Sequence, residues 1–403
     1  MNVRGEADTP EPIVLVQGPA LTAYSFGEEH PLQPSRHDLT MSLLRDLGWL
    51  DTPGLTIEEP RPATLTELLT VHTLPFIQAV QTAQSIAKGT RPESDLSLYG
   101  LGTEDNPLFP GIHDAASLLA GASLHAMQAV LDGRAIHAYN PAGGMHHAMR
   151  TRGAGFCIYN DIAVAIAAAV AAGRRVAYID LDAHHGDGVQ AIFYDDPRVL
   201  TISVHESGRF LFPGTGETKE TGAGDGAGAC LNVPLPMVAG TEHILLAFDR
   251  IVAPAVRAYR PDIVVAQTGC DTHHADPLTD LTAGMELYPA LAARLHDLVH
   301  EVSEGRWLIV GGGGYDPADV TPRAWTAFFG TVLGKETADV VLPESWRRAS
   351  RAKGGDPPLH LLDDPGRPVT RPPGPSFLSE LDDIEAGALA LSQRRFGPSV
   401  AGV

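Results

Sequence analysis

Short apolar runs alternate with longer helical patterns along most of the chain. The short runs are apolar at nearly every position, which is typical of strands that are buried on both faces of a sheet. We predict strands at residues 13–16, 135–139, 176–181, 199–204, 263–267 and 307–310. Helical patterns lie between them, at residues 35–47, 112–131, 160–172, 242–259, 284–302 and 322–333.

This alternation predicts a single α/β domain, built on a mostly parallel multi-stranded sheet with helices on both faces. Ligands of such folds bind at the carboxyl ends of the strands. We assign residues 12–335 to this domain and 336–403 to a C-terminal extension, which is rich in Pro, Gly and charge between residues 353 and 375. The amphipathic segment 377–391 is expected to dock back as a terminal helix.

The most unusual polar stretch follows the predicted strand at 176–181. Residues 180–187 read Asp-Leu-Asp-Ala-His-His-Gly-Asp. Asp182 and His184 are two positions apart, so in extended backbone their side chains point to the same face. A carboxylate and an imidazole on one face supply two ligands of an open metal site, which needs a third protein ligand and a position for water.

The third ligand should be an oxygen or nitrogen donor at another strand end. Asp271 follows the predicted strand at 263–267 and a glycine, and is the best candidate. His273 and His274 are rival ligands, which we expect to line the pocket or to face solvent instead. An Asp-His-Asp set accepts Zn²⁺ or Fe²⁺, so the residues leave the ion open.

Two adjacent histidines form a second candidate group. His146 and His147 follow the glycine pair at 143–144, where the backbone can approach other groups closely. Histidines beside a metal suit general acid–base chemistry because their pKa lies near neutrality. Such histidines need carboxylates to orient them, and Asp180 and Asp187 are free to do this.

Four consecutive glycines at 311–314 precede Tyr315. The glycines permit close approach to a substrate, and a phenol there can donate a hydrogen bond to an oxyanion. No Lys, Ser or Thr follows in the spacing of a phosphate-binding loop. Tyr315 could equally be a core aromatic that covers the sheet.

The composition of the chain limits the classes of molecule that it is expected to bind. The 29 basic and 49 acidic residues give a net charge of −20, which argues against nucleic acid and is compatible with cationic partners. The three cysteines have no CxxC spacing, so no cysteine-rich zinc module is indicated. The acidic N-terminal residues 1–8 lack the apolar region of a signal peptide, and no apolar run is long enough to span a membrane. We expect a cytoplasmic protein without a membrane partner.

Taken in chain order, the candidate site residues and several further motifs resemble the zinc-dependent histone deacetylase family, which has the arginase/deacetylase-like fold. The resemblance is closer to the bacterial acetoin-utilisation branch of this family. The resemblance covers roughly residues 12–335, and the run at 269–278 points to the bacterial branch. The other motifs are His30-Pro31, Pro34-Ser35-Arg36, Glu104-Asp105-Asn106-Pro107, residues 143–147, Gly155-Phe156-Cys157, Asn160-Asp161, residues 179–188, Phe212-Pro213-Gly214-Thr215-Gly216 and residues 311–315.

The resemblance implies an amidohydrolase that removes acetyl groups from lysine side chains of proteins and releases acetate and the free amine. His146 would pair with Asp180, and His147 with Asp187. His147 would take a proton from water, and Tyr315 would stabilise the oxyanion. By resemblance, the metal ligands are Asp182, His184 and Asp271, and the catalytic residues are His146, His147, Asp180, Asp187 and Tyr315.

The same resemblance implies a substrate channel and two structural potassium sites. Phe156 and Phe212 would form the channel walls, with Gly155 and Leu278 beside them, Asp105 holding the substrate backbone at the rim and Arg36 by an inner cavity. The inner K⁺ site would use Asp180, Asp182, His184, Ser203 and Val204, and the outer site Phe193, Asp196 and Val199, mainly through backbone carbonyls.

Three alternatives are considered. Arginase-type ureohydrolases use two manganese ions and need further aspartates, but Gly186 and His273 stand at those positions, so we expect one ion. An acetylpolyamine amidohydrolase would apply the same chemistry to a small acetylated amine, and the net charge suits both substrates. A non-catalytic acetyl-lysine-binding module is the third alternative.

Overall fold

The framework of the fold is a parallel sheet. The computed structural model describes residues 10–85, 95–362 and 372–396 of the chain, with side chains up to residue 387. Within these residues the sheet has eight strands in the order β2-β1-β3-β8-β7-β4-β5-β6, and every neighbouring pair is parallel. The predicted α/β sheet is therefore confirmed. The strands are β1 (Ile13–Val16), β2 (Leu55–Glu58), β3 (His137–Asn140), β4 (Val176–Asp180), β5 (Val199–Glu206), β6 (Cys230–Leu235), β7 (Ile263–Gln267) and β8 (Trp307–Val310).

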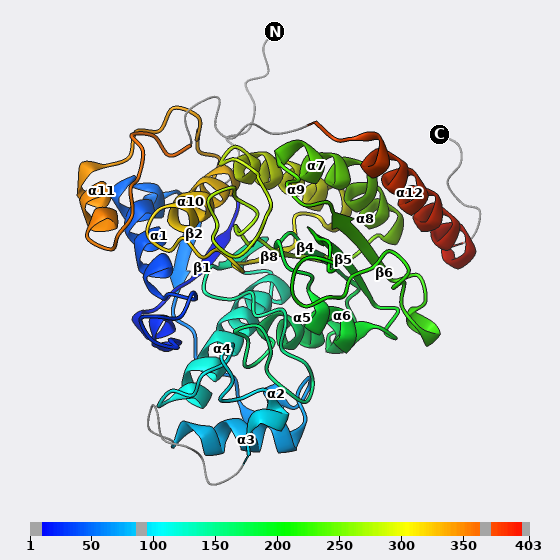
Figure 1. Cartoon of the computed structure of the whole chain (residues 1–403), viewed down its shortest axis with the longest axis horizontal. Helices are drawn as coiled ribbons and strands as arrows, with labels where there is room; N and C mark the ends of the chain where they lie inside the picture. Colours follow the sequence, from blue (N-terminus) through cyan, green and yellow to red (C-terminus); the bar gives the residue numbers. More distant parts are fainter. Residues whose placement is uncertain (1–9, 86–94, 363–371, 397–403) are drawn as a thin grey trace.

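Helices cover both faces of this sheet (Figure 1). None of those in the described ranges is long and apolar enough to cross a membrane. The α-helices are α1 (Ser35–Asp46), α2 (Leu65–Leu68), α3 (Leu74–Gln84), α4 (Ile112–Leu131), α5 (Asp161–Ala171), α6 (Asp187–Phe193), α7 (Thr241–Ala247), α8 (Ala253–Tyr259), α9 (Leu287–Ser303), α10 (Val320–Val332), α11 (Glu344–Arg351) and α12 (Pro375–Phe396).

The two faces of the sheet bury separate apolar cores, and β1 contributes to both. Ile13 and Leu15 point into the core beneath α1, α9 and α10, while Val14 and Val16 point into the core beneath α4 and α5. Successive side chains of a strand point to opposite faces, so a strand covered on both sides must be apolar throughout. This is why the central strands could be recognised from their sequence.

The two strands that the sequence analysis missed, β2 and β6, are the edges of the sheet. The side chains of β2 are half-buried or exposed, so this strand lacks an uninterrupted apolar run. Pro234 lies within β6 and cannot donate a ladder hydrogen bond. A proline is tolerated in an edge strand, which has a free side.

The predicted helix at 242–259 is present, but it is irregular. It consists of α7, a π-helical turn at Phe248–Val252 and α8. Pro254 is the cause, because proline has no N–H to donate and its ring clashes with the carbonyl four residues earlier. Another boundary also moved: α9 begins at Leu287 rather than at Gly284, whose N–H donates to the hydroxyl of Thr241 at 3.1 Å.

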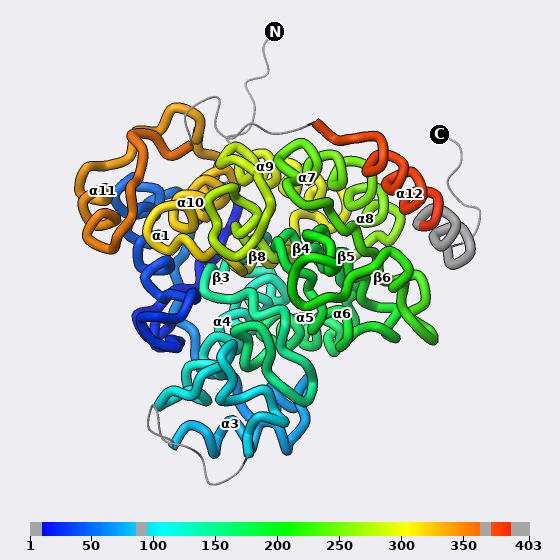
Figure 2. The backbone as a smooth tube through the Cα atoms, in the orientation of Figure 1, coloured from blue at the N-terminus to red at the C-terminus, as the bar shows by residue number. Residues whose placement is uncertain are grey.

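The C-terminal extension packs against the sheet-and-helix body, at two places on opposite sides of the molecule (Figure 2). On one side, α11 lies against α1, where Trp346 is 1% exposed and its indole N–H donates to the carbonyl of Leu39 at 2.9 Å. On the other side, the terminal helix predicted at 377–391 is present as α12 and buries Phe377, Leu381 and Ile384. Residues 363–371 of the Pro/Gly-rich stretch lie outside the described residues.

The burial of Trp346 predicts that the extension contributes to stability. Trp346→Ala removes a buried indole and its hydrogen bond, so we expect the free energy of unfolding to fall by about 3–5 kcal/mol. Urea unfolding measures this change. The matched control is Leu359→Ala, because Leu359 belongs to the same extension and is 51% exposed. Equal effects of the two substitutions would contradict a packed α11.

Candidate functional site

Four polar loops meet at one edge of the sheet. They follow β3, β8, β7 and β4, which are consecutive neighbours in the sheet and run in the same direction. Their carboxyl ends therefore lie side by side. The loop after β3 carries the histidine pair, the loop after β8 the four glycines, the loop after β7 Asp271, and the loop after β4 the residues 181–186.

Asp182, His184 and Asp271 form a compact group of potential metal ligands. The imidazole Nδ1 of His184 lies 2.8 Å from Oδ2 of Asp271 and 3.2 Å from Oδ1 of Asp182. All three side chains are buried, and their ligand atoms lie within 4.8 Å of one another. The structure therefore brings together the three residues that the sequence analysis proposed as ligands.

Neighbouring groups hold the two carboxylates in place. The amide of Gln267 donates to Oδ2 of Asp182 at 2.6 Å, and the N–H of Gly313 donates to the same atom at 2.7 Å. The N–H of Ala183 donates to Oδ1 of Asp271 at 2.8 Å. The sequence analysis missed Gln267, although a polar residue at the end of an otherwise apolar strand was a usable signal.

The charges in this group are compatible with a bound cation. Burial, and then the nearby Asp182, raise the pKa of Asp271 to about 8. Burial alone would lower the pKa of His184, but hydrogen bonds to the two carboxylates raise it to about 10. A positive charge is therefore favoured between the carboxylates, and a divalent ion can take the place of the proton. One imidazole and two carboxylates form a donor set suited to Zn²⁺ or Fe²⁺.

Each histidine of the adjacent pair has its own carboxylate. Nδ1 of His146 lies 2.8 Å from Oδ2 of Asp180, and Nδ1 of His147 lies 2.7 Å from Oδ1 of Asp187. The two Nε2 atoms are 3.0 Å apart. The hydroxyl of Tyr178, which the sequence analysis missed, donates to Oδ2 of Asp180 at 2.5 Å. Tyr178 lies two positions before Asp180 in β4, so both side chains point to the same face.

The two histidines differ in their affinity for protons. Burial would lower the pKa of His146, but the carboxylates of Asp180 and Asp182 raise it to about 9. Burial, and then the positive charge of His146, lower the pKa of His147 to about 4, although Asp187 opposes this. At neutral pH, His146 is therefore charged and His147 is neutral.

The two positions where a second metal would need aspartates carry Gly186 and His273. A Cβ atom on Gly186 would lie only 2.0 Å from Oδ2 of Asp180, so no side chain fits at this position. His273 is buried and Nδ1 of its ring accepts from the N–H of Ala275 at 3.2 Å, while His274 is exposed. Among the described residues, neither of these histidines belongs to the ligand group at this edge of the sheet.

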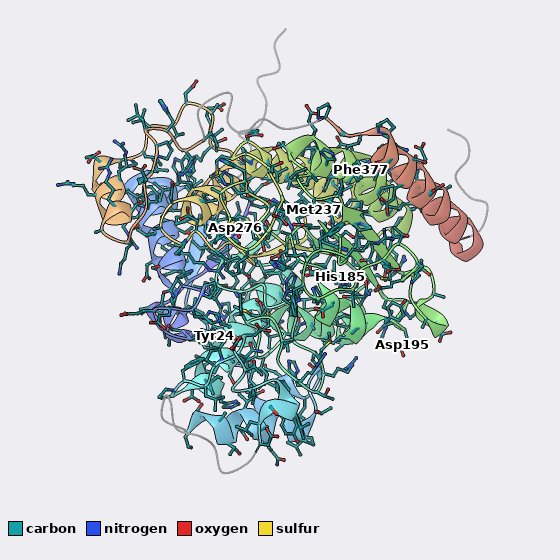
Figure 3. The ribbon with its side chains drawn as sticks, viewed as in Figure 1. Tyr24, His185, Asp195, Met237, Asp276 and Phe377 are labelled. Carbon is teal, nitrogen blue, oxygen red and sulfur yellow. The ribbon has the colours of Figure 1, made fainter. Side chains whose placement is uncertain are left out.

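Tyr315 is positioned by the glycine loop before it. Its N–H donates to Oδ2 of Asp276 at 2.7 Å, and the guanidinium of Arg36 donates to the carbonyl of Gly314 at 3.0 Å. The phenol ring lies 6.2 Å from the imidazole of His184, and burial raises its pKa well above the usual value. The phenol therefore keeps its proton. Asp276, labelled in Figure 3, was quoted in the motif at 269–278, but its support of Tyr315 was not anticipated.

Two phenylalanines flank this group. The ring of Phe212 lies 5.0 Å from His147, and the ring of Phe156 lies 5.6 Å from Tyr315. Gly155 separates them, and its φ of +50° suits glycine. A Cβ atom here would lie 2.5 Å from Cδ2 of His147 and 2.8 Å from Cε1 of Phe212. A glycine is therefore required for the wall to approach His147 so closely.

The predicted rim residue Asp105 is connected to this wall. Asp105 is exposed, and its carbonyl lies 3.2 Å from Nε2 of His30. The ring of His30 lies 4.4 Å from that of Phe156. Across the site, the N–H of the half-buried Leu278 donates to Oδ1 of Asp276 at 3.0 Å.

The residues of the two predicted potassium sites lie near β4 and β5. Asp180 and Ser203 are paired in the register of these strands, and Ser203 also approaches Nδ1 of His205 at 2.8 Å. The outer set lies in the turn between α6 and β5. There the N–H of Asp196 donates to the carbonyl of Phe193 at 3.0 Å, and that of Val199 to the carbonyl of Asp196 at 3.2 Å.

His185, the second histidine of residues 180–187, is directed away from the ligand group. Its Nδ1 lies 2.8 Å from the hydroxyl of Thr215, and its Nε2 lies 2.9 Å from the amide oxygen of Gln190. Thr215 belongs to the same motif as Phe212. His185 therefore helps to hold the loop that carries this wall residue.

Comparisons with known proteins identify relatives of this chain. A sequence model of the histone deacetylase domain matches residues 30–332. The chain is 45% identical over 332 residues to the acetoin utilization protein AcuC of Bacillus subtilis, covering 82% of this chain and 84% of that protein. It is 36% identical over 327 residues to AcuC of Staphylococcus xylosus, with 81% and 84% covered.

A solved structure is also similar. It is described as a crystal structure of an HDAC homolog complexed with SAHA, and it superposes with a TM-score of 0.80 at 29% identity. The match covers 94% of this chain and 99% of that one.

Proposed function

Because the chain belongs to the histone deacetylase family, we propose that it removes acetyl groups from lysine side chains of proteins with the help of a zinc ion. The observation that carries this proposal is the buried group of Asp182, His184 and Asp271 beside two histidine–carboxylate pairs. Amide hydrolysis needs an electrophilic centre, a base and an oxyanion donor, and this group offers residues for each.

Asp182, His184 and Asp271 would hold the ion. When bound, Zn²⁺ polarises the acetamide carbonyl and lowers the pKa of water. The hydrogen bonds from Gln267 and Gly313 to Asp182 keep the carboxylate in its orientation as the ion binds. Fe²⁺ is the alternative ion, because the same donor set accepts it.

His147 is the residue that we assign as general base. It lies on the side of the pair that faces Phe212, at 5.0 Å, and His184, at 5.9 Å between ring centroids. It would accept a proton from water as the water oxygen attacks the acetyl carbon. The same proton would pass to the lysine nitrogen as the C–N bond breaks, which yields acetate and the free amine. His146 would contribute mainly a positive charge.

Tyr315 would donate a hydrogen bond to the oxyanion that forms at the acetyl oxygen. Its raised pKa keeps the phenol protonated, as a donor requires. Asp276 and Arg36 hold the loop that carries it. A donor that is fixed before the reaction stabilises the developing charge without reorganisation.

The wall and the rim support an acetylated lysine side chain as the substrate. Phe156 and Phe212 offer apolar surfaces for its four methylene groups, with Gly155 and Leu278 beside them. The exposed carboxylate of Asp105 is available to backbone N–H groups of a peptide. An acetylpolyamine is the alternative substrate, since it has the same acetamide but no peptide backbone. Arg36 would line an inner cavity where acetate collects.

We retain both potassium sites as part of the proposal. The pairing of Asp180 with Ser203 supports the inner site, where Asp182, His184 and Val204 would also contribute. The turn after α6 supports the outer site, because it carries the carbonyl groups of Phe193, Asp196 and Val199. A cytoplasmic location stays a prediction from the sequence.

The first prediction concerns the ion. We expect a chelator to abolish hydrolysis of a fluorogenic acetyl-lysine peptide, and zinc to restore it, because the carbonyl is not polarised without a cation. Ferrous iron added under anaerobic conditions tests the alternative ion. A metal-free protein with full activity would overturn the proposed mechanism.

The second prediction concerns Tyr315. Tyr315→Phe should lower kcat about 10²–10³-fold, as for the loss of one oxyanion donor, while the zinc content stays unchanged. Tyr194→Phe is the control, because Tyr194 is half-buried and lies outside the site. Unchanged zinc with reduced turnover also separates an enzyme from a non-catalytic binding module. Full activity of the Tyr315 variant would refute the oxyanion role.

The third prediction separates the two substrate classes. Asp105→Ala should lower kcat/KM for an acetyl-lysine peptide roughly 10-fold or more, consistent with the loss of a charge-assisted hydrogen bond. Hydrolysis of acetylated putrescine should be unaffected, since this molecule has no backbone to bind. Asp114→Ala, at an exposed carboxylate on α4, is the control. Acetylputrescine as the better substrate of the unmodified enzyme would favour the polyamine alternative.

A further inference from the structure

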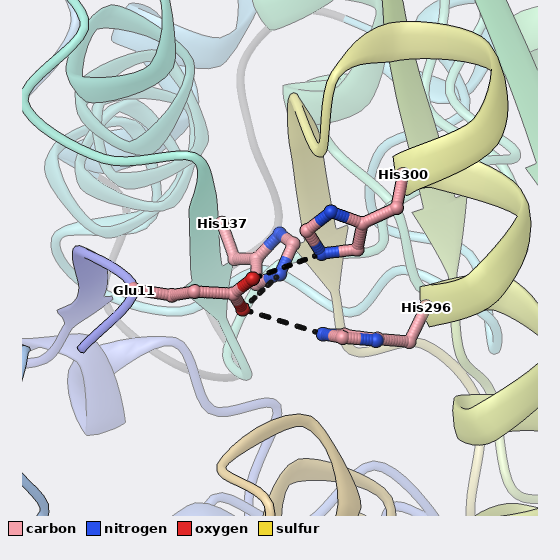
Figure 4. A group of neighbouring side chains, drawn as sticks. All are labelled: Glu11, His137, His296 and His300. Atoms are coloured by element: carbon pink, nitrogen blue, oxygen red, sulfur yellow. Dashed lines mark ion pairs between the residues drawn. The ribbon is translucent and has the colours of Figure 1, made fainter. Parts of the chain in front are cut away.

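A second cluster of metal-ligand side chains lies at the opposite edge of the sheet, where the strands begin (Figure 4). Glu11 precedes β1, and His137 is the first residue of β3. His296 and His300 lie one turn apart on α9. The four residues come from three distant parts of the chain, and the sequence analysis singled out none of them.

The strand register explains why these side chains meet. His137 is paired with Ile13 on one side and with Trp307 on the other. Residues that are paired in register point to the same face of the sheet, which here is the face covered by α9. On α9, His296 and His300 are four positions apart, so both rings project from the same side of the helix.

The contacts of Glu11 with the three imidazoles have the length expected between ligands of one ion. Oε2 of Glu11 lies 3.4 Å from Nε2 of His137 and 3.4 Å from Nε2 of His296, while Oε1 lies 3.3 Å from Nε2 of His300. An ion with zinc-like bonds of about 2.0–2.1 Å in tetrahedral geometry separates its ligand atoms by about 3.3 Å. All four ligand atoms lie within 4.8 Å of one another.

The burial of His137 is the second observation that points to a ligand. Its side chain is 0% exposed, and its Nε2 lies 3.4 Å from the carboxylate of Glu11. Neither ring nitrogen has a hydrogen bond of ordinary geometry with a described residue.

We propose that these four side chains bind a structural zinc ion. Four protein ligands close the coordination sphere, as in structural rather than catalytic zinc sites. Three imidazoles and only one carboxylate favour Zn²⁺ over Mg²⁺ or Ca²⁺, which prefer oxygen ligands. Side-chain exposures of 41% for Glu11, 30% for His296 and 35% for His300 leave a path for the ion.

Such an ion would connect the segment before β1 to the start of β3 and to α9. These elements belong to the same half of the sheet as β8, whose far end carries the loop of Tyr315. The proposed role of the ion is therefore structural, and it does not depend on the proposed deacetylase chemistry. The inference can be tested by metal content and stability, without reference to activity.

The test uses the full chain, equilibrated with Zn²⁺ and desalted, with bound zinc measured by mass spectrometry. We expect two zinc ions per chain in the unmodified protein and one in the double variant His296→Ala/His300→Ala. The double variant should keep kcat/KM on an acetyl-lysine peptide within about twofold. Added zinc should also raise the Tm of the double variant less than that of the unmodified protein, because an ion bound only to the folded state stabilises that state.

The matched control is His125→Ala. His125 lies on α4 with 25% side-chain exposure and pairs with the carboxylate of Glu58 at 2.6 Å, but among the described residues it belongs to no metal-ligand group. This variant should keep both ions. If the unmodified protein and the double variant bind the same number of ions, the proposal is overturned. If the unmodified protein binds one zinc ion and the double variant binds none, the site of Glu11 and the three histidines is supported. In that case the proposal of a catalytic zinc at Asp182, His184 and Asp271 is refuted.

Discussion

The structure depends on the burial of three aspartates at the ends of neighbouring parallel strands. Asp180, Asp182 and Asp271 are at most 1% exposed, and a buried carboxylate is costly unless it is paired and hydrogen-bonded. Their partners come from other loops at the same edge: His146 for Asp180, and Gly313 for Asp182. The arrangement of four loops around one point is therefore required by electrostatics as well as by any reaction that the point supports.

Close packing of backbone against these groups limits which residues the site tolerates. A Cβ atom on Gly186 would lie 2.0 Å from a carboxylate oxygen of Asp180, and one on Gly313 would lie 2.1 Å from an oxygen of Asp271. A Cβ atom on Gly155 would likewise lie 2.5 Å from Cδ2 of His147. These glycines bring backbone close to the charged groups and leave no room for a further carboxylate at position 186. Position 186 therefore supplies no carboxylate ligand for a second ion at this site.

The carboxyl ends and the amino ends of the strands each carry a cluster of ionisable side chains, but the two clusters differ in composition. At the carboxyl edge, carboxylates outnumber the imidazole in the ligand group, which suits an ion that is exchanged for a proton. At the amino edge, three imidazoles surround the single carboxylate of Glu11, with contacts of 3.3–3.4 Å. Three imidazoles and one carboxylate form a donor set that suits Zn²⁺ better than ions that prefer oxygen ligands.

The sequence by itself determined the parallel sheet, its central strands and the chemical groups of the site. Strands covered on both faces must be apolar throughout, and Asp182 and His184 are close enough in the chain for strand geometry to orient them. Only the tertiary structure decided which residues support these groups, because Tyr178 and Asp276 are ordinary in isolation and the polar end of β7, Gln267, does not by itself show which carboxylate it contacts. It also decided the edge strands, whose partly exposed or proline-containing sequences lack the apolar pattern. The cluster around His137 was out of reach for the same reason: its members are far apart in the chain, and only the register of β1, β3 and β8 beneath α9 brings them together.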